Sequence, residues 1–178
     1  MKSYWIKSVE ENDRVKFDAL EENCKTDICI IGGGLTGLTT AYNLSKYKIR
    51  TVLIEKDEIG RQASGNSTAK ITSQHGLIYK YLTDSKGKEF ARKYYEANER
   101  AINKIEEIIQ KENIDCGFEH VPAYIFTQSI QEVEKIKDEV DAVNAFGGKA
   151  KLIEAKDIAI NKLNSVDSVS YTHLRAHE

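Results

Sequence analysis

The sequence predicts an α/β fold that begins with a parallel β-α-β unit. Three observations carry this prediction. A short apolar run at 28–31 leads directly into glycines, a helical pattern of apolar residues follows, and a second β-branched run occupies 51–54. Such runs are typical of buried strands, and parallel neighbours need a crossover helix between them. This is the construction of a Rossmann-like nucleotide-binding unit.

The glycines after the first strand have the spacing G-x-G-x-x-G, at Gly32, Gly34 and Gly37. In this motif the first glycine turns the chain, the second lets the backbone approach phosphates, and the third lets the helix pack on the strand. A helix over 35–46 would direct its first amides, from Leu35 and Thr36 onward, and its positive dipole end at a diphosphate. The sequence therefore predicts a dinucleotide site built from backbone, without a lysine.

Glu55 ends the second predicted strand, about 20 residues after the glycine motif. A carboxylate at this place accepts hydrogen bonds from a ribose diol and repels a 2'-phosphate, which disfavours NADP. The helix before it lacks the glycine that commonly follows a helix, since Tyr47, Lys48 and Ile49 stand there. We expect this to cost about 1 kcal/mol or less.

The segment 56–70 after this strand is rich in small and hydroxyl residues and includes Lys56, Ser64 and Thr68. Next to a dinucleotide site, such a loop is expected to contact the ligand. A long amphipathic helix is predicted over 88–113. We expect its apolar stripe to be core: Phe90, Tyr94, Ala97, Ala101, Ile105 and Ile108.

Beyond this helix, residues 115–127 predict one or two strands with an edge or bend at Pro122, the only proline. Apolar spacing predicts a surface helix over 130–143, closed by Gly147 and Gly148, and a further strand over 149–153. A plain nicotinamide dehydrogenase would continue in regular β-α units, so the order points away from one. An NAD-dependent dehydrogenase with an insertion and a non-catalytic dinucleotide-binding module stay open as alternatives.

Composition limits the class of protein. The 178 residues are 40% hydrophobic, enough to bury the core of one modest domain or a little more. The 26 basic and 28 acidic residues are spread without long blocks of one sign, so we expect no nucleic-acid partner. No apolar run is long enough for a membrane span or signal core, which predicts a soluble, cytoplasmic protein. Cys24, Cys29 and Cys116 predict neither a disulfide nor a metal site, and Cys29 is expected to be buried in its strand.

The last residues, 168–178, differ in character from the preceding sequence. Residues 169–178 can be encoded by DNA that resembles a transposase-type sequencing adapter read in frame. We therefore expect this tail to be an artefact and the native protein to continue beyond Asp167. His173 and His177 have the i, i+4 spacing of a helical metal pair, but in such a tail no metal site is expected.

Several segments carry a resemblance to a known family. Residues 26–41 and 51–56, followed by Ile59-Gly60 and 63–70, resemble the amino-terminal half of FAD-dependent oxidoreductases of the D-amino acid oxidase superfamily, which includes glycine and sarcosine oxidases. Ser3-Tyr4-Trp5 and residues 68–76 resemble a branch whose members often carry a carboxyl-terminal Rieske domain. The cysteines and histidines before the tail offer no Rieske ligand set.

The resemblance implies extended FAD, with the diphosphate over 32–37, the adenosine ribose on Glu55 and the loop 61–70 along the pyrophosphate toward the flavin. The substrate would be a small amine or amino acid, oxidised by hydride transfer to the flavin, with the electron acceptor left open. His75 would lie where this segment approaches the flavin, although a structural role is the alternative; Lys70 could favour reduced flavin or be solvated. The implied cofactor-binding residues are Gly32, Gly34, Leu35, Thr36, Gly37, Glu55, Lys56, Ser64 and Thr68.

The resemblance also implies a division of the chain. Residues 1–25 would be an extension on the outside of the fold, 26–113 a partial FAD-binding Rossmann-like domain, and 114–167 the start of an α+β substrate domain. Catalytic residues are expected beyond residue 167, so the chain by itself is predicted to be inactive. His120 is expected to be a strand residue near the surface.

Overall fold

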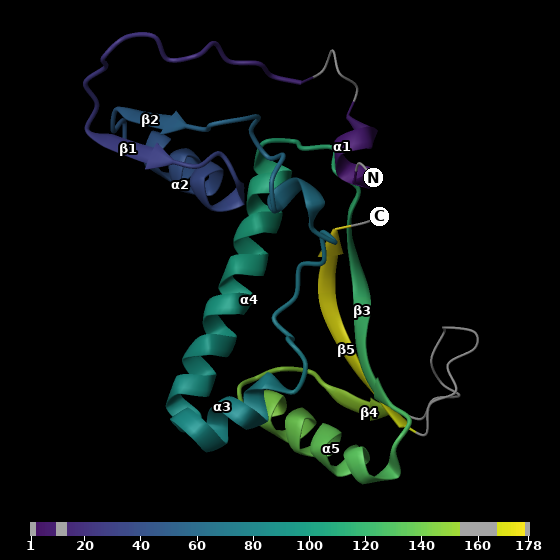
Figure 1. Ribbon diagram of the computed structural model, residues 1–178. Helices are drawn as coiled ribbons and strands as arrows, with labels where there is room; N and C mark the ends of the chain where they lie inside the picture. Colours follow the sequence, from purple (N-terminus) through teal and green to yellow (C-terminus); the bar gives the residue numbers. More distant parts are fainter. Residues whose placement is uncertain (1–2, 10–13, 154–166, 177–178) are drawn as a thin grey trace. The chain divides into compact units, whose positions relative to one another are not determined.

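The computed structural model describes residues 3–9, 14–153 and 167–176 (Figure 1). Contacts within the chain divide it into two compact units, Met1–Thr68 and Ala69–Glu178. Each unit is described here by itself. The predicted functional domains, 26–113 and 114–167, follow a different division and stay predictions.

The first unit contains the predicted β-α-β arrangement. Strand β1 (Ile28–Ile31) leads through the glycine turn to helix α2 (Leu35–Ser45), and strand β2 (Thr51–Ile54) returns beside β1. The two strands pair in parallel, from Ile28 opposite Thr51 to Ile31 opposite Ile54. The fold predicted from the apolar runs is confirmed.

One prediction about β1 is wrong. Cys29 is exposed rather than buried, and the neighbouring outward side chain, Ile31, is 89% exposed. The strand alternates, with Ile28 and Ile30 half-buried, because within this unit α2 covers only one face of the two-stranded sheet. An apolar run without polar alternation predicted burial on both faces.

Just after α2, a lysine adopts the left-handed conformation for which glycine is the common residue. The helix ends at Ser45 with Lys46 as its C-cap, and Lys48 then adopts a left-handed conformation with φ of 57°. A lysine there bears the steric cost that a glycine avoids.

The amino-terminal extension forms a short helix, α1 (Tyr4–Ser8), which contacts a 3-10 helix, η2 (Ser64–Asn66), in the same unit. The hydroxyl of Ser3 caps α1 by accepting from the amide of Ile6 at 3.3 Å. The extension therefore packs on the loop that follows β2.

The second unit combines three helices with an antiparallel sheet. Its elements are α3 (Ile78–Lys86), α4 (Lys88–Lys111), β3 (Phe118–Thr127), α5 (Ile130–Asn144), β4 (Lys151–Ile153) and β5 (Asp167–Ala176). The strand order is β3-β5-β4, and α5 contacts all three strands. Strand β3 runs through Pro122 as an edge strand, where the missing amide of a proline is tolerated. Helix α3 was not predicted.

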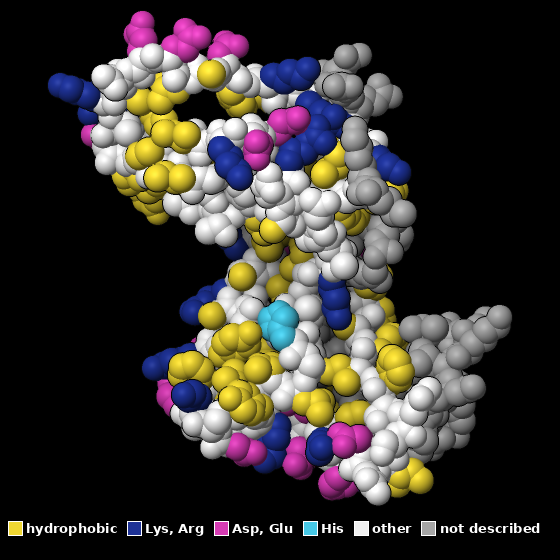
Figure 2. Space-filling view, in the orientation of Figure 1, with side chains coloured by type: hydrophobic (Ala, Val, Ile, Leu, Met, Phe, Trp, Pro, Cys, Tyr) yellow, Lys and Arg dark blue, Asp and Glu magenta, His cyan; other side chains and the backbone are white. Residues whose placement is uncertain are grey.

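The core of this unit gathers aromatic and aliphatic side chains from α3, α4, α5 and the segment that leads into β4. Tyr79, Tyr95, Ile136, Val143 and Ala150 form its buried cluster. The rings of Tyr79 and Tyr95 meet edge to face with centroids 5.5 Å apart. Outside the core, both acidic and basic side chains lie on the visible surface of this unit (Figure 2). On α5, Lys135 pairs with Glu132 at 2.9 Å.

Helix α4 forms as predicted, but its buried stripe is displaced by one residue. The structure buries Ala91, Tyr95 and Ile102, whereas Phe90, the first residue of the predicted stripe, is 51% exposed. Two apolar stripes run side by side on this helix, and helical spacing alone does not say which of them meets the core.

Strand β5 lies in the segment predicted to be adapter-derived. Its backbone pairs with β3 from Asp167 opposite Thr127 to Ala176 opposite Phe118. His173 therefore stands in a strand and not on a helix, while His177 lies outside the described residues. Backbone pairing is largely independent of side-chain identity, so the origin of this segment stays a prediction.

Candidate dinucleotide site

The glycine turn begins where β1 ends. Gly32 adopts φ of 105°, a conformation that side chains rarely allow, and its amide donates to the carbonyl of Ile54 at 2.7 Å. This bond ties the turn to the end of the neighbouring strand β2. The chain can then enter α2 directly, with Gly34 as its N-cap.

Gly37 makes this reversal possible because α2 packs directly on the turn. A Cβ atom at this position would lie 2.0 Å from the carbonyl oxygen of Gly32 and 3.3 Å from the side chain of Ile30. The first obstacle is backbone, which cannot rotate away. The close helix packing expected of the third motif glycine is therefore present in the structure.

Glu55 has a structural role that the sequence did not reveal. One carboxylate oxygen accepts from the amide of Gly33 at 2.7 Å, and the other accepts from the amide of Asp57 at 3.1 Å. These two bonds, the one from Gly33 first, lower the pKa of the Glu55 carboxyl below its ordinary value. Each oxygen retains a further lone pair, so the carboxylate can still accept a ribose hydroxyl.

A second glycine turn follows β2 and repeats the spacing of the first. Gly60 has φ of 74°, and a Cβ atom on Gly65 would lie 2.2 Å from the carbonyl oxygen of Gly60. The amide of Gly60 donates to the carbonyl of Gly33 at 2.9 Å, which joins the two turns. The shared Gly-x4-Gly spacing, 32/37 and 60/65, is the sequence signal that could have predicted this second turn.

Ser64 reaches the start of α2 from this second turn. Its hydroxyl accepts from the amide of Leu35 at 2.9 Å, and a Cβ atom on Gly34 would come within 3.1 Å of it. The structure thus brings together Gly34, Leu35 and Ser64, three of the predicted cofactor-binding residues. Thr36 lies on the exposed first turn of the same helix.

The remaining candidates have the following surroundings. The side chain of Lys56 is 81% exposed, and its amine lies 3.9 Å from the carboxylate of Asp57. Thr68 is exposed at the end of the first unit. Lys70 and His75 belong to the second unit, where His75 is exposed and its Nδ1 lies 3.2 Å from the hydroxyl of Tyr94. His120 is an exposed strand residue beside Glu106, as expected.

A buried carboxylate in the second unit was missed. Glu139, on α5, is 1% exposed and accepts from the amides of Tyr79 at 3.0 Å and Lys80 at 2.7 Å, the first turn of α3. It also accepts from the side-chain amide of Gln74 at 2.6 Å. Burial raises the pKa of Tyr79, whose hydroxyl donates to the carbonyl of Ser73 at 2.5 Å. These bonds fix the chain on both sides of His75.

The described residues include neither a metal-binding cluster nor a helix that could span a membrane. Nowhere in ranges 3–9, 14–153 and 167–176 do three or more histidine, cysteine or acidic side chains gather as a metal site would require. The described helices likewise include none that combines the length and the apolar character needed to cross a membrane.

Comparison with known proteins gives consistent matches. Residues 27–171 match the family described as FAD dependent oxidoreductase, or DAO. The chain is 40% identical over 158 residues to YhfW of Bacillus subtilis, named as a Rieske 2Fe-2S iron-sulfur protein, covering 89% of this chain and 30% of that protein. It is 27% identical over 158 residues to gamma-glutamylputrescine oxidoreductase of Escherichia coli, covering 88% and 36% respectively.

A solved structure shows the same fold. Glycine oxidase from Bacillus cereus superposes with a TM-score of 0.61 at 19% identity, covering 85% of this chain and 40% of that one. The chain spans about a third of the length of the two curated relatives above.

Proposed function

The chain belongs to the FAD dependent oxidoreductase (DAO) family, and from this premise we propose that it forms the FAD-binding part of an enzyme that oxidises a carbon–nitrogen bond. The observation that carries the proposal is the joined pair of glycine turns with Glu55 and Ser64 beside the first turn of α2. Family membership also sets aside the alternative of a nicotinamide cofactor. When bound, FAD accepts a hydride equivalent from the substrate carbon.

The residues of the first unit fit the diphosphate of such a cofactor. The first amides of α2 point out of the helix, and the positive end of its dipole favours a negative group there. The glycine at 37 keeps the helix close to the turn, so the backbone can approach the phosphates. Ser64 accepts from Leu35 through its oxygen and keeps its own proton to donate to a phosphate oxygen.

Glu55 would bind the adenosine ribose of the cofactor. Its carboxylate, held by Gly33 and Asp57, has free lone pairs for ribose hydroxyls and a negative charge that repels a 2'-phosphate. Leu35, Thr36 and the backbone of Gly32 and Gly34 would line the diphosphate. We place Lys56 near the adenosine and Thr68 toward the flavin, by the order of the chain after β2.

The substrate class is proposed as a primary or secondary amine, including amino acids. The names of two similar proteins support it, since one is a gamma-glutamylputrescine oxidoreductase and the other a glycine oxidase. Both names denote compounds with a carbon bonded to nitrogen, the kind of bond that a flavin can oxidise by accepting hydride. Because the chain spans about a third of its curated relatives, substrate turnover is a property to test in the full-length protein.

Two measurements test the proposal. Titration of the chain with FAD should quench flavin fluorescence to saturation, while NADP should not compete. Full-length protein loaded with FAD should lose its visible flavin absorbance when mixed anaerobically with a panel of amines and amino acids. Failure to bind FAD would contradict the cofactor assignment, and stable absorbance with every nitrogen compound would contradict the substrate class.

A further inference from the structure

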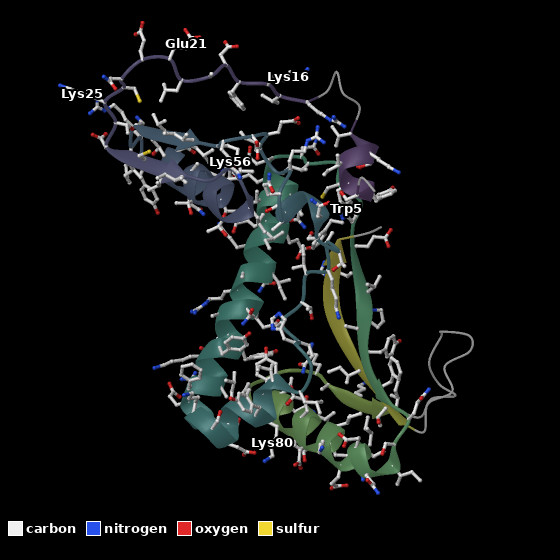
Figure 3. The ribbon with its side chains drawn as sticks, in the orientation of Figure 1. Trp5, Lys16, Glu21, Lys25, Lys56 and Lys80 are labelled. Carbon is white, nitrogen blue, oxygen red and sulfur yellow. The ribbon has the colours of Figure 1, made fainter. Side chains whose placement is uncertain are left out.

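Side chains at the start of α1 hold the backbone of the second glycine turn across 62 positions of sequence. The hydroxyl of Ser3 donates to the carbonyl of Gly65, and the indole N–H of Trp5 donates to the carbonyl of Ser67 at 2.9 Å. Ile6 adds an apolar contact, since its Cδ1 lies 3.4 Å from where a Cβ atom on Gly65 would be. Figure 3 labels Trp5 on α1.

The segment that receives these bonds has weak backbone–backbone hydrogen bonds of its own. Helix η2 is a single 3-10 turn, and its backbone bonds are long, 3.3 Å from the amide of Asn66 to Ala63 and 3.4 Å from that of Ser67 to Ser64. Hydrogen-bond geometry in such turns is poorer than in an α-helix. The side-chain amide of Asn66 donates to the carbonyls of Arg61 at 3.0 Å and Gln62 at 2.9 Å, and the two side-chain bonds from α1 add to these in fixing this backbone.

Helix α1, like η2, needs contacts from outside the helix to be stable. It has five residues, far fewer than the number at which an isolated helix becomes stable in water. Ser3 caps its beginning, and the guanidinium of Arg14 donates to the carbonyls of Ile6 at 2.7 Å and Val9 at 3.0 Å at its end. We expect α1 and η2 to be ordered together, each through the other.

The bonds from α1 affect Ser64, because Ser64 is the first residue of η2. Its hydroxyl meets the amide of Leu35 at the start of α2, so the position of η2 sets the position of this hydroxyl. We propose that Ser3 and Trp5 are positioning residues for the cofactor diphosphate, acting through the carbonyls of Gly65 and Ser67 to hold Ser64 at α2. This inference rests on the proposed function.

The substitutions Ser3→Ala and Trp5→Phe in the full chain remove one donor each and keep most of the packing. We expect each to raise the Kd for FAD by about three- to tenfold, the range for one intramolecular hydrogen bond. Ser3→Thr, which retains a hydroxyl, should restore binding. Tyr4→Phe is the matched control, because Tyr4 is 63% exposed beside Trp5 and should leave the Kd unchanged.

A double-mutant cycle separates positioning from general stability. If Trp5 acts through Ser64, Trp5→Phe should change the Kd little when Ser64→Ala is already present. Additive losses would overturn the inference, as would unchanged FAD binding in both Ser3→Ala and Trp5→Phe. Circular dichroism of each variant shows whether it folds.

Trp5 also provides a readout that does not depend on affinity. It is the only tryptophan of the sequence, so its indole N–H gives one NMR signal and its fluorescence reports one site. FAD should shift that signal and quench that fluorescence, and Ser3→Ala should move the free-state signal toward that of an exposed indole. An indole signal unaffected by either change would contradict the inference. Failure of the unaltered chain to bind FAD would instead contradict the proposed function.

Discussion

Glu55 and Glu139 use the same chemistry in two different settings. Each carboxylate accepts hydrogen bonds from two backbone amides near a turn or helix start, Gly33 and Asp57 for the first, Tyr79 and Lys80 for the second. Glu55 is partly exposed and its oxygens can take further donors, whereas Glu139 is 1% exposed and takes Gln74 as its third donor. The accessible carboxylate of Glu55 can therefore bind a ligand, whereas the buried carboxylate of Glu139 holds α3 and α5 together.

The largest effect is expected from Glu139→Ala. This change leaves two backbone amides and one side-chain amide without their acceptor, and we expect a loss of about 3 kcal/mol or more in the free energy of unfolding. Glu134→Ala on the same helix is the control, because Glu134 is 76% exposed beside Lys137 and should change stability by less than about 0.5 kcal/mol. Urea unfolding measures the stability of both variants, and equal losses would show that the hydrogen bonds of Glu139 do not stabilise the fold.

Gly37→Ala should come next. The new methyl group would meet the carbonyl oxygen of Gly32, so α2 must move away from the turn, at a cost of about 1–3 kcal/mol and with loss of FAD binding. Thr40→Ala, on an exposed face of the same helix, should leave both stability and flavin-fluorescence titration nearly unchanged. Normal FAD affinity in Gly37→Ala would argue against a diphosphate at this turn.

The pH dependence of FAD affinity tests the role of the Glu55 carboxylate. The amides of Gly33 and Asp57 hold the pKa of Glu55 below its ordinary value of 4.5. The carboxylate is therefore fully charged above pH 4.5, and the hydrogen bonds that need its charge are lost as the pH falls through the lowered pKa. FAD affinity should therefore weaken in acid below about pH 4.5, and Glu55→Gln should weaken it by about tenfold at neutral pH.

Asp27→Asn is the matched control for Glu55→Gln. Asp27 also has a lowered pKa, caused by its bond to Arg50, but it lies at the opposite end of the two strands from the glycine turn. Its substitution should leave FAD affinity at neutral pH close to that of the unaltered chain. If both variants lose affinity equally, the effect belongs to the sheet and not to ligand contact.

The two carboxylates also show what a sequence can and cannot predict. Glu55 follows a strand at a fixed offset from a glycine motif, so local spacing predicted a ribose-binding role for it, which stays a prediction. The partners of Glu139 lie about 60 residues earlier, and no local pattern connects them. A signal did exist: Glu139 stands three residues after Ile136 and four before Val143, on the buried face of α5. A charge within an apolar stripe indicates a buried partner.

Other errors came from packing that sequence does not encode locally. The two neighbouring apolar stripes of α4 satisfied helical spacing equally well, and contact with the core selected the one with Tyr95. Cys29 was expected to be buried because an apolar run does not reveal that a sheet has one uncovered face. The β-α-β unit was predicted correctly because its strands, turn and helix are specified by adjacent residues.

The smallest expected effect is a gain of stability in the first unit, at the end of α2. Lys48 has φ of 57°, so Lys48→Gly should relieve the left-handed strain and raise the free energy of unfolding by about 0.5–1 kcal/mol. Lys46→Gly is the matched control of opposite sign, because Lys46 is in the right-handed helical region and glycine there should cost about 0.5–1 kcal/mol. Thermal unfolding compares the two, and FAD affinity should stay constant in both, since this end of the helix lies away from the glycine turn. A loss of stability in Lys48→Gly would mean that the lysine side chain contributes more than its backbone conformation costs.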